Sequence, residues 1–240
     1  MNYYGTEEYY RKLKHLETDV YTQENLKTPI EVTDLTDEYR LEHCYYADEK
    51  HKKPGWSAED GSVNRLYKNG VKIFEWKTLD AETLTKKIFR HSNGRDYMIF
   101  NEGLYGYSVL ELDTLECMHY IPAQSHRDGD GFEETFIWCE AFYNPYNDYA
   151  VVEGCYWAAP FQFIVVDLRD PLKIVPTDEW KEDVNLLDQE SLTYVKGFDF
   201  EKWENDVLVC TSAAIDSVVE KRISDRLTLR IQPKAIDQSK

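Results

Sequence analysis

The chain has 240 residues, and its 28 lysines and arginines against 45 aspartates and glutamates give a net charge of −17. That balance argues against nucleic acid as a partner, because phosphate contacts need a clustered cationic surface. It argues equally against binding to an anionic membrane surface. Hydrophobic residues make up 42% of the chain and aromatic residues 14%, so we expect a folded protein rather than a disordered one.

The five cysteines are widely scattered, their number is odd, and no CxxC pair occurs. A zinc knuckle is therefore excluded and a disulfide framework is disfavoured. We expect reduced, mostly buried thiols and no cofactor. The first residues show neither the basic nor the apolar segment of a secretory signal, and no run approaches the ~18 apolar residues of a membrane span. Together these features predict a cytoplasmic location.

Residues 6–17 carry the clearest helical pattern of the chain. Thr6 can cap the helix, and Glu7 and Glu8 suit its positive N-terminal end. The segment that follows is polar, with an acidic stretch at 33–38 and a strand-like alternation at 39–45. We therefore predict two parts: residues 1–61, a helix and an irregular segment that pack on the body, and residues 62–240, an all-β domain.

Hairpin signals dominate the chain after residue 62. Asn69-Gly70 separates two runs of strand type, and Asn93-Gly94 repeats the arrangement, because these residues tolerate a positive φ. Short strands with turn signals about every ten residues continue to residue 232, which is typical of a sandwich, barrel or propeller. Residues 178–192 could form one acidic helix or a long loop.

Two segments, residues 97–121 and 150–176, share one order of elements. Each has a strand, a break with glycine and aromatic residues, an apolar strand ending in aspartate, and another strand. The run at 165–171 resembles strands of WD40-like propeller blades, and the resemblance extends loosely over 64–232. It lacks a Trp-Asp dipeptide, and the aspartates at 113 and 167 lie 54 residues apart, beyond the ~40–45 of a WD40 repeat. The resemblance implies a mainly antiparallel, propeller-like meander, with a sandwich as the alternative.

The acidic loop at 125–134 has the densest ligand-like chemistry. Asp128 and Asp130 alternate with glycines, and Glu133 and Glu134 follow. Carboxylates spaced in this way can surround a hard cation, but the further ligands of an EF-hand loop are missing. Asp128 and Asp130 are thus weak metal candidates. We expect the four carboxylates to form an exposed patch that binds a partner.

A second constellation consists of two glutamates and two tryptophans. We expect Trp138 and Glu140 to share one face of a strand, and Glu153 and Trp157 to share a face of the neighbouring strand. Two carboxylates flanked by indoles could act as acid and base on a sugar, with Glu140 and Glu153 catalytic. They could equally form a ligand-binding patch, or be ordinary packing and surface residues.

The usual catalytic motifs are missing. The six histidines form no HxH or HExxH pair, and there is no GxSxG, P-loop or GxGxxG motif. Cys117 and His119 alternate along one strand, which we attribute to packing. The sequence favours a non-enzymatic intracellular protein that binds a basic partner, for example an immunity-type protein neutralising a basic toxin. The alternative is an enzyme or binding module for carbohydrate or another polar small molecule.

Calcium titration tests the interpretation of the acidic loop. Because the ligand pattern is incomplete, isothermal titration at physiological ionic strength should show no micromolar calcium site. The comparison is with the variant Asp128→Ala plus Asp130→Ala, which should behave like the parent protein. A micromolar site that disappears in this variant would contradict the prediction.

Overall fold

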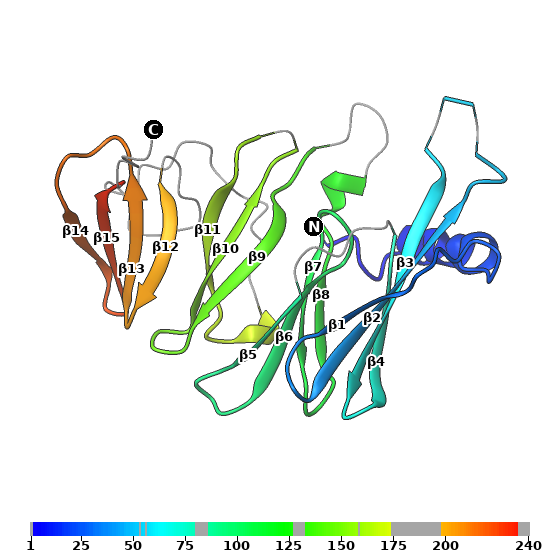
Figure 1. The fold of residues 1–240 in the computed structure, drawn as a ribbon, viewed down its shortest axis with the longest axis horizontal. Helices are drawn as coiled ribbons and strands as arrows, with labels where there is room; N and C mark the ends of the chain where they lie inside the picture. The colour runs from blue at the N-terminus through cyan, green and yellow to red at the C-terminus, as the bar shows by residue number, and fades with distance from the viewer. Residues whose placement is uncertain are drawn as a thin grey trace.

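The computed structural model describes residues 2–52, 54–55, 57–79, 86–126, 133–157, 159–173 and 198–234. These residues form four β-sheets and one short N-terminal helix, so the predicted all-β, mainly antiparallel class is confirmed. The sheets stand side by side in a row that follows the chain (Figure 1). Asp128, Asp130 and the segment 178–192 lie outside the described residues.

The first two sheets are antiparallel meanders whose strand order follows the chain. Sheet 1 consists of β1 (Glu31–Asp34), β2 (Tyr39–Asp48), β3 (Glu59–Lys68) and β4 (Val71–Thr78). Sheet 2 consists of β5 (Lys86–Arg90), β6 (Asp96–Asn101), β7 (Tyr107–Glu111) and β8 (Cys117–Tyr120). The hairpin predicted at Asn69-Gly70 is confirmed, with φ of 48° and 81° at the two turn residues.

The other two sheets complete the row. Sheet 3 consists of β9 (Ile137–Asn144), β10 (Tyr149–Cys155) and β11 (Gln162–Asp167), with β10 in the centre. Sheet 4 consists of β12 (Asp199–Glu204), β13 (Val207–Ser212), β14 (Val219–Ser224) and β15 (Leu227–Pro233). Its β13 and β15 are parallel neighbours, the one exception to antiparallel pairing in the described sheets.

An apolar core fills each space between consecutive sheets. Side chains alternate across a strand, so sheets 2 and 3 bury one row of apolar residues on each face. In β6, Met98 and Phe100 face sheet 1 while Ile99 faces sheet 3. In β10, Val152 faces sheet 2 while Val151 faces sheet 4. This two-sided burial explains the near-continuous apolar runs that these strands show in the sequence.

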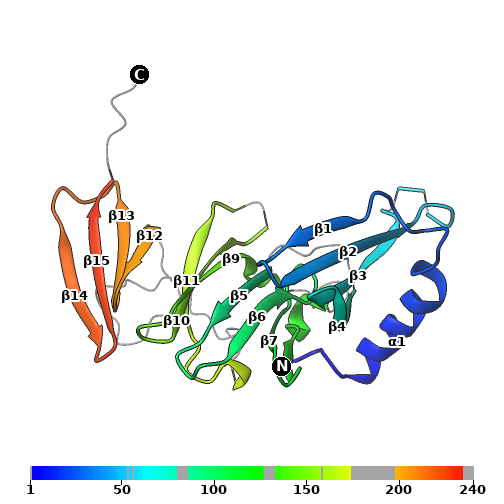
Figure 2. The ribbon, with the colours of Figure 1, turned by 60° about the horizontal axis from the view of Figure 1, so that its bottom comes forward.

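The outer faces of the two end sheets differ: a helix covers one, and charged side chains lie on the other. Helix α1 (Glu7–His15) continues as a π-helical turn (Leu16–Val20) and packs on the outer face of sheet 1 (Figure 2). On the outer face of sheet 4, Arg230 pairs with Glu204 and Glu220. No ring or barrel closes in the part of the chain that the structure describes. The described sheets therefore form an open row.

The N-terminal helix begins as predicted. The side chain of Thr6 accepts a hydrogen bond from the backbone N–H of Tyr9, 3.1 Å away, and Glu7 and Glu8 occupy the first turn. The division predicted between residues 61 and 62 falls inside β3, so sheet 1 takes strands from both predicted parts. Residues 39–45, predicted from their alternation, belong to the longer β2.

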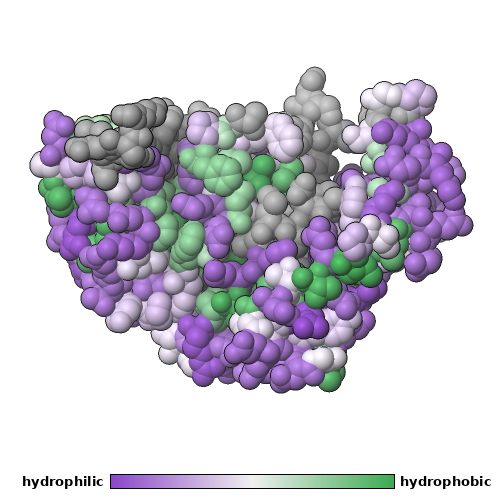
Figure 3. Space-filling model, viewed as in Figure 1, coloured by the Kyte–Doolittle hydropathy of each residue, from purple (hydrophilic) through white to green (hydrophobic). Residues whose placement is uncertain are grey.

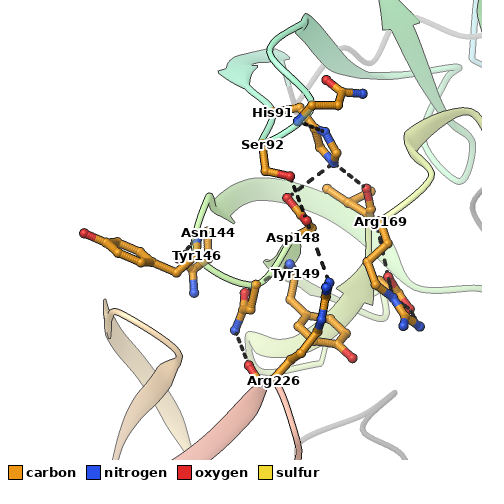
Figure 4. A network of polar contacts seen from close by, with 12 residues as sticks. His91, Ser92, Asn144, Tyr146, Asp148, Tyr149, Arg169 and Arg226 are labelled. Carbon is orange, nitrogen blue, oxygen red and sulfur yellow. Dashed lines mark hydrogen bonds and ion pairs between the residues drawn. The ribbon is translucent and has the colours of Figure 1, made fainter.

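The carboxylate of Asp148, in the β9–β10 turn, contacts groups from sheets 2, 3 and 4 (Figure 4). It accepts hydrogen bonds from the Tyr143 hydroxyl at 2.6 Å and from Ser92 Oγ at 2.9 Å, and Arg226 lies 4.0 Å away. The backbone carbonyl of Asp148 accepts a bond from the Leu168 N–H at 2.8 Å. These partners come from the β5–β6 turn, from sheet 3 and from the β14–β15 turn, so one side chain links three sheets.

A bulge in β9 makes Gly154 of β10 irreplaceable. A Cβ at Gly154 would lie 1.8 Å from the carbonyl oxygen of Ile137 in the neighbouring strand. We expect Gly154→Ala to lower the free energy of unfolding by about 3 kcal/mol, because the backbone of Ile137, which cannot turn aside as a flexible side chain would, blocks the methyl group. Urea denaturation measures this difference.

The matched control is Gly94→Ala in the β5–β6 turn. Gly94 has a φ of 84° with open space around it, so alanine there should cost only the ~1–2 kcal/mol of a left-handed backbone. Equal losses of unfolding free energy in Gly154→Ala and Gly94→Ala would contradict this prediction, because they would show that the backbone around Gly154 moves easily to make room for a methyl group.

Candidate functional site

Glu140 and Glu153 lie directly opposite each other on β9 and β10. Partial burial raises the pKa of Glu153 above its ordinary value, and the negative charges of Glu140 and Asp199 raise it further. Lys87 Nζ approaches Glu140 Oε1 to 3.5 Å from β5. The predicted proximity of the two carboxylates is therefore present, on the face of sheet 3 that turns toward sheet 4.

Trp138 lies on the opposite face of β9. It pairs with Gly154 across the strands, is 1% exposed and stacks on Tyr107 with the ring centroids 4.0 Å apart. The expectation that Trp138 and Glu140 share a face is wrong, because Cys139 is an extra residue at a bulge and reverses the alternation. Trp138 is a core residue between sheets 2 and 3 and has no surface to offer a ligand.

Trp157 lies beyond the end of β10 and is 67% exposed, and Phe161, directly before β11, is 66% exposed. Apolar surface gathers over this end of β10 and β11 (Figure 3). The backbone N–H of Trp157 donates to Glu134 Oε1, and burial raises the pKa of Glu134. Glu133 is exposed. The structure thus separates the four residues of the Glu/Trp constellation into a carboxylate pair, a core indole and an exposed indole.

A cavity of ≈ 360 Å³ lies between α1, β4 and β8. Aromatic rings and one buried polar pair form much of its wall: Tyr4, Tyr9, Phe74, Trp76, Glu102 and His119. Glu102, directly after β6, is only 2% exposed. No motif in the sequence points to this site, although a glutamate placed immediately after a fully buried strand is a signal that could have identified it.

The buried pair at this cavity is a glutamate held by two partners. Glu102 Oε1 contacts His119 Nδ1 and accepts a hydrogen bond from Ser108 Oγ at 2.7 Å. The ring of His119 stacks on Tyr4, with centroids 4.1 Å apart and planes 8° from parallel. Strands β7 and β8 thus supply the polar partners, and the segment before α1 supplies the stacked ring.

The same geometry argues against a nucleophile at His119. Both Ser108 Oγ, at 3.3 Å, and Cys117 Sγ, at 3.9 Å, approach the Nδ1 atom that already faces Glu102. Burial, and then the charge of Glu102, raise the pKa of the Cys117 thiol, so it stays protonated. Ser–His and Cys–His catalysis requires an activated nucleophile on a free base, which this arrangement does not provide.

His91, Ser92 and Asp148 form another His–Ser–Asp set, with a different role (Figure 4). His91 Nδ1 accepts the Asn93 N–H at 3.1 Å, so the proton is on Nε2, which lies 3.0 Å from the Leu168 carbonyl oxygen. Ser92 Oγ bonds to the Asp148 carboxylate rather than to His91. The set lacks the serine–histidine bond of a catalytic triad. Its hydrogen bonds instead connect the β5–β6 turn of sheet 2 to sheet 3.

An acidic groove of ≈ 300 Å³ lies beside the β1–β2 and β3–β4 turns of sheet 1. Its charged lining consists of four carboxylates and one guanidinium: Asp34, Asp37, Glu38, Glu42 and Arg40. Arg40 Nε binds Asp34 at 2.8 Å, and Glu42 accepts a hydrogen bond from Tyr67 at 2.9 Å. The sequence shows the acidic stretch at 33–38, but only the pairing of β1 with β2 and β3 adds Glu42 to it.

No family model, curated protein or solved structure matches this chain. Within the described residues, no group of three or more His, Cys, Asp or Glu residues is placed to hold a metal ion. A helix of the length and apolarity needed to span a bilayer is likewise absent from the described part of the chain. The function must therefore be argued from the sites themselves.

The pH dependence of stability tests the Glu140–Glu153 pair. The folded pKa of Glu153 lies above its unfolded value, so its contribution to stability falls as the pH rises through that window. Glu153→Gln should therefore be more stable than the parent at pH 8, by about 0.2–1 kcal/mol, the scale of cross-strand pairs. The gain should vanish at pH 4, as measured by urea denaturation across this range.

Glu140→Gln provides the comparison. This substitution removes the negative charge of Glu140, the second-largest cause of the raised Glu153 pKa, and leaves burial, the largest cause, in place. Glu140→Gln should raise the free energy of unfolding at pH 8 by less than Glu153→Gln does. The pKa of Glu153, followed by NMR, should fall only part of the way to its ordinary value. A gain from Glu153→Gln that does not change with pH would contradict the electrostatic account.

Proposed function

We propose that this chain is a non-enzymatic protein-binding protein whose partner is a basic protein. The observation that carries the proposal is the acidic groove of sheet 1, where four carboxylates face one arginine. Asp37 and Glu38 are exposed at this groove. Lys68 Nζ lies 3.9 Å from the Glu38 carboxylate, and both side chains are partly or fully exposed. A Lys or Arg side chain of a partner would find charge-assisted hydrogen bonds at this groove.

The charge of the whole chain acts in the same direction. A net charge of −17 produces a long-range field that attracts a basic protein and raises the rate of encounter. The groove then provides a concave surface on which the partner can dock. Association should be fast and salt-sensitive, because the attraction is screened beyond ~10 Å at 0.1 M salt.

The proposal includes a cytoplasmic location and, as one concrete form, an immunity-type protein that neutralises a basic toxin. All five cysteines are unpaired in the structure, which agrees with a reducing compartment. The charge supports the basic character of the partner. The loop residues Asp128, Asp130, Glu133 and Glu134 stay a second proposed contact region, of which only Glu133 and Glu134 are described.

The alternative function, action on or binding of a carbohydrate or another polar small molecule, is supported by a single feature. Glu140 and Glu153 face each other, and one of them has a raised pKa, as acid catalysis requires. However, Trp138 is buried on the other face. The indole walls that would hold a sugar are therefore not assembled around the pair, and the basic-protein proposal has the better support.

Binding kinetics at several salt concentrations test the proposal. A partner captured from native lysate with the full chain should be basic, and its association rate should fall steeply as salt rises. Asp37→Asn plus Glu38→Gln should slow association several-fold at low salt and change dissociation less, because rim charges act mainly on encounter. Surface plasmon resonance separates the two rates.

The control is Glu7→Gln plus Glu8→Gln, which removes the same charge from the exposed first turn of α1. It should slow association less than the groove variant does. A second comparison neutralises the four loop carboxylates at 128, 130, 133 and 134. A neutral or acidic partner, or an association rate indifferent to salt, would reject the proposal.

A further inference from the structure

Two cysteines of sheet 3 lie next to each other across the β9–β10 pair. Cys155 is directly opposite Ile137, and Cys139, two positions further along β9, is the extra residue at the bulge. In a regular antiparallel pair such residues are diagonal neighbours about 7–8 Å apart. The bulge shortens this offset, because it fits an additional residue into the same length of strand. The Cys139 Sγ atom lies 3.9 Å from the carbonyl oxygen of Ile137, so this side chain turns back toward the position of Cys155.

The two thiols also share their chemical surroundings. Burial, then contact with the Cys155 thiol and then the charge of Glu153 raise the pKa of Cys139 to about 11. Both cysteines are nonetheless partly exposed, so a small reagent can reach them. The other three cysteines, which all lie in the described part of the chain, have carboxylates or an arginine rather than a cysteine among the charged groups that act on them. Cys139 and Cys155 are therefore the pair of thiols that the fold brings together.

We propose that Cys139 and Cys155 form a reversible disulfide when the protein meets a small-molecule disulfide such as oxidised glutathione. A thiolate at either position would add a like charge beside Glu140 and Glu153. A disulfide removes both ionisable groups and carries no charge, so it suits this partly buried face better. Because solvent can reach it, the bond is of the labile kind that thiol reductants open again.

The exchange takes place in two steps. The raised pKa of Cys139 keeps that thiol protonated, so the first attack falls to Cys155. The Cys155 sulfur bonds to one glutathione sulfur, and the other glutathione leaves with the thiol proton. The Cys139 sulfur then bonds to the Cys155 sulfur, and the first glutathione leaves with the proton of Cys139. In all, two cysteines are oxidised and one oxidised glutathione is reduced to two molecules of glutathione.

This inference does not rest on the proposed function. The thiol pair belongs to sheet 3, whereas the acidic groove lies at the turns of sheet 1. Failure of the disulfide would leave the basic-protein proposal standing, and a partner that is not basic would leave the disulfide proposal standing. A disulfide that opens again also agrees with a cytoplasmic location, because the disulfides of cytosolic proteins are mostly transient.

Peptide mapping tests the proposal on the full chain without any substitution. The fully reduced protein is incubated with millimolar oxidised glutathione, quenched with acid, alkylated and digested for mass spectrometry without reduction. Two of the five free thiols should disappear, one peptide should join Cys139 to Cys155, and dithiothreitol should restore all five thiols. Retention of all five thiols, glutathione that stays bound to either cysteine, or a linkage between other cysteines would overturn the proposal.

Single substitutions then separate the roles of the two thiols. Cys139→Ser should trap glutathione on Cys155, because the second thiol that would displace it is missing. Cys155→Ser should react at least ten-fold more slowly than Cys139→Ser, because its remaining thiol is held protonated. Cys117→Ser, which removes a partly exposed cysteine of sheet 2, is the matched control and should still form the link between Cys139 and Cys155. Glutathione that does not accumulate on Cys155 in Cys139→Ser would overturn the proposed exchange.

A zinc titration distinguishes a disulfide from a metal site formed by the same thiols. The reduced chain is titrated with zinc and followed by calorimetry, with Cys139→Ser for comparison. We expect no micromolar zinc site at this pair, because the described residues place no third ligand beside it. A micromolar site that disappears in Cys139→Ser would overturn the disulfide assignment, since metal-bound thiolates would then be the stable state of the pair.

Discussion

The two-sided burial of the inner sheets is the constraint on which the rest of this structure depends. Sheets 2 and 3 each present apolar residues on both faces, so neither can stand without a neighbour on each side. The chain meets this requirement by adding sheets one after another in a row. Asp148 connects the sheets at one of their turns. Its carboxylate binds Ser92 of sheet 2 and Tyr143 of sheet 3, its backbone carbonyl accepts a bond from within sheet 3, and Arg226 of sheet 4 lies nearby.

The candidate sites lie where this constraint is relaxed. Sheet 1 stands at the end of the row, and only a short helix covers its outer face. Polar and charged residues can therefore occupy its edges and turns without breaking a core between sheets. The acidic groove forms at its turns, and the aromatic cavity forms where α1 bridges from the edge strand β4 toward β8.

Local features of the fold could be predicted because short stretches of chain decide them. Asn69-Gly70 adopts positive φ in a tight turn whatever surrounds it, and Thr6 caps a helix through a bond to a residue three positions away. The β class of the chain after residue 62 follows in the same way from repeated turn signals. The number of sheets and their open arrangement could not be predicted, because ring closure depends on how layers pack rather than on any turn.

The sequence by itself determined most of the strands after residue 62, the tight turns, the capped helix and the acidic character of the protein, since each depends on neighbouring residues or on composition. Only the tertiary structure decided which side chains meet. The single extra residue Cys139 moved Trp138 into the core and away from Glu140, because one bulged position reverses every side chain beyond it. Glu102 and His119, seventeen residues apart, meet because β7 and β8 return along the same sheet; such a long-range pairing carries no local signature.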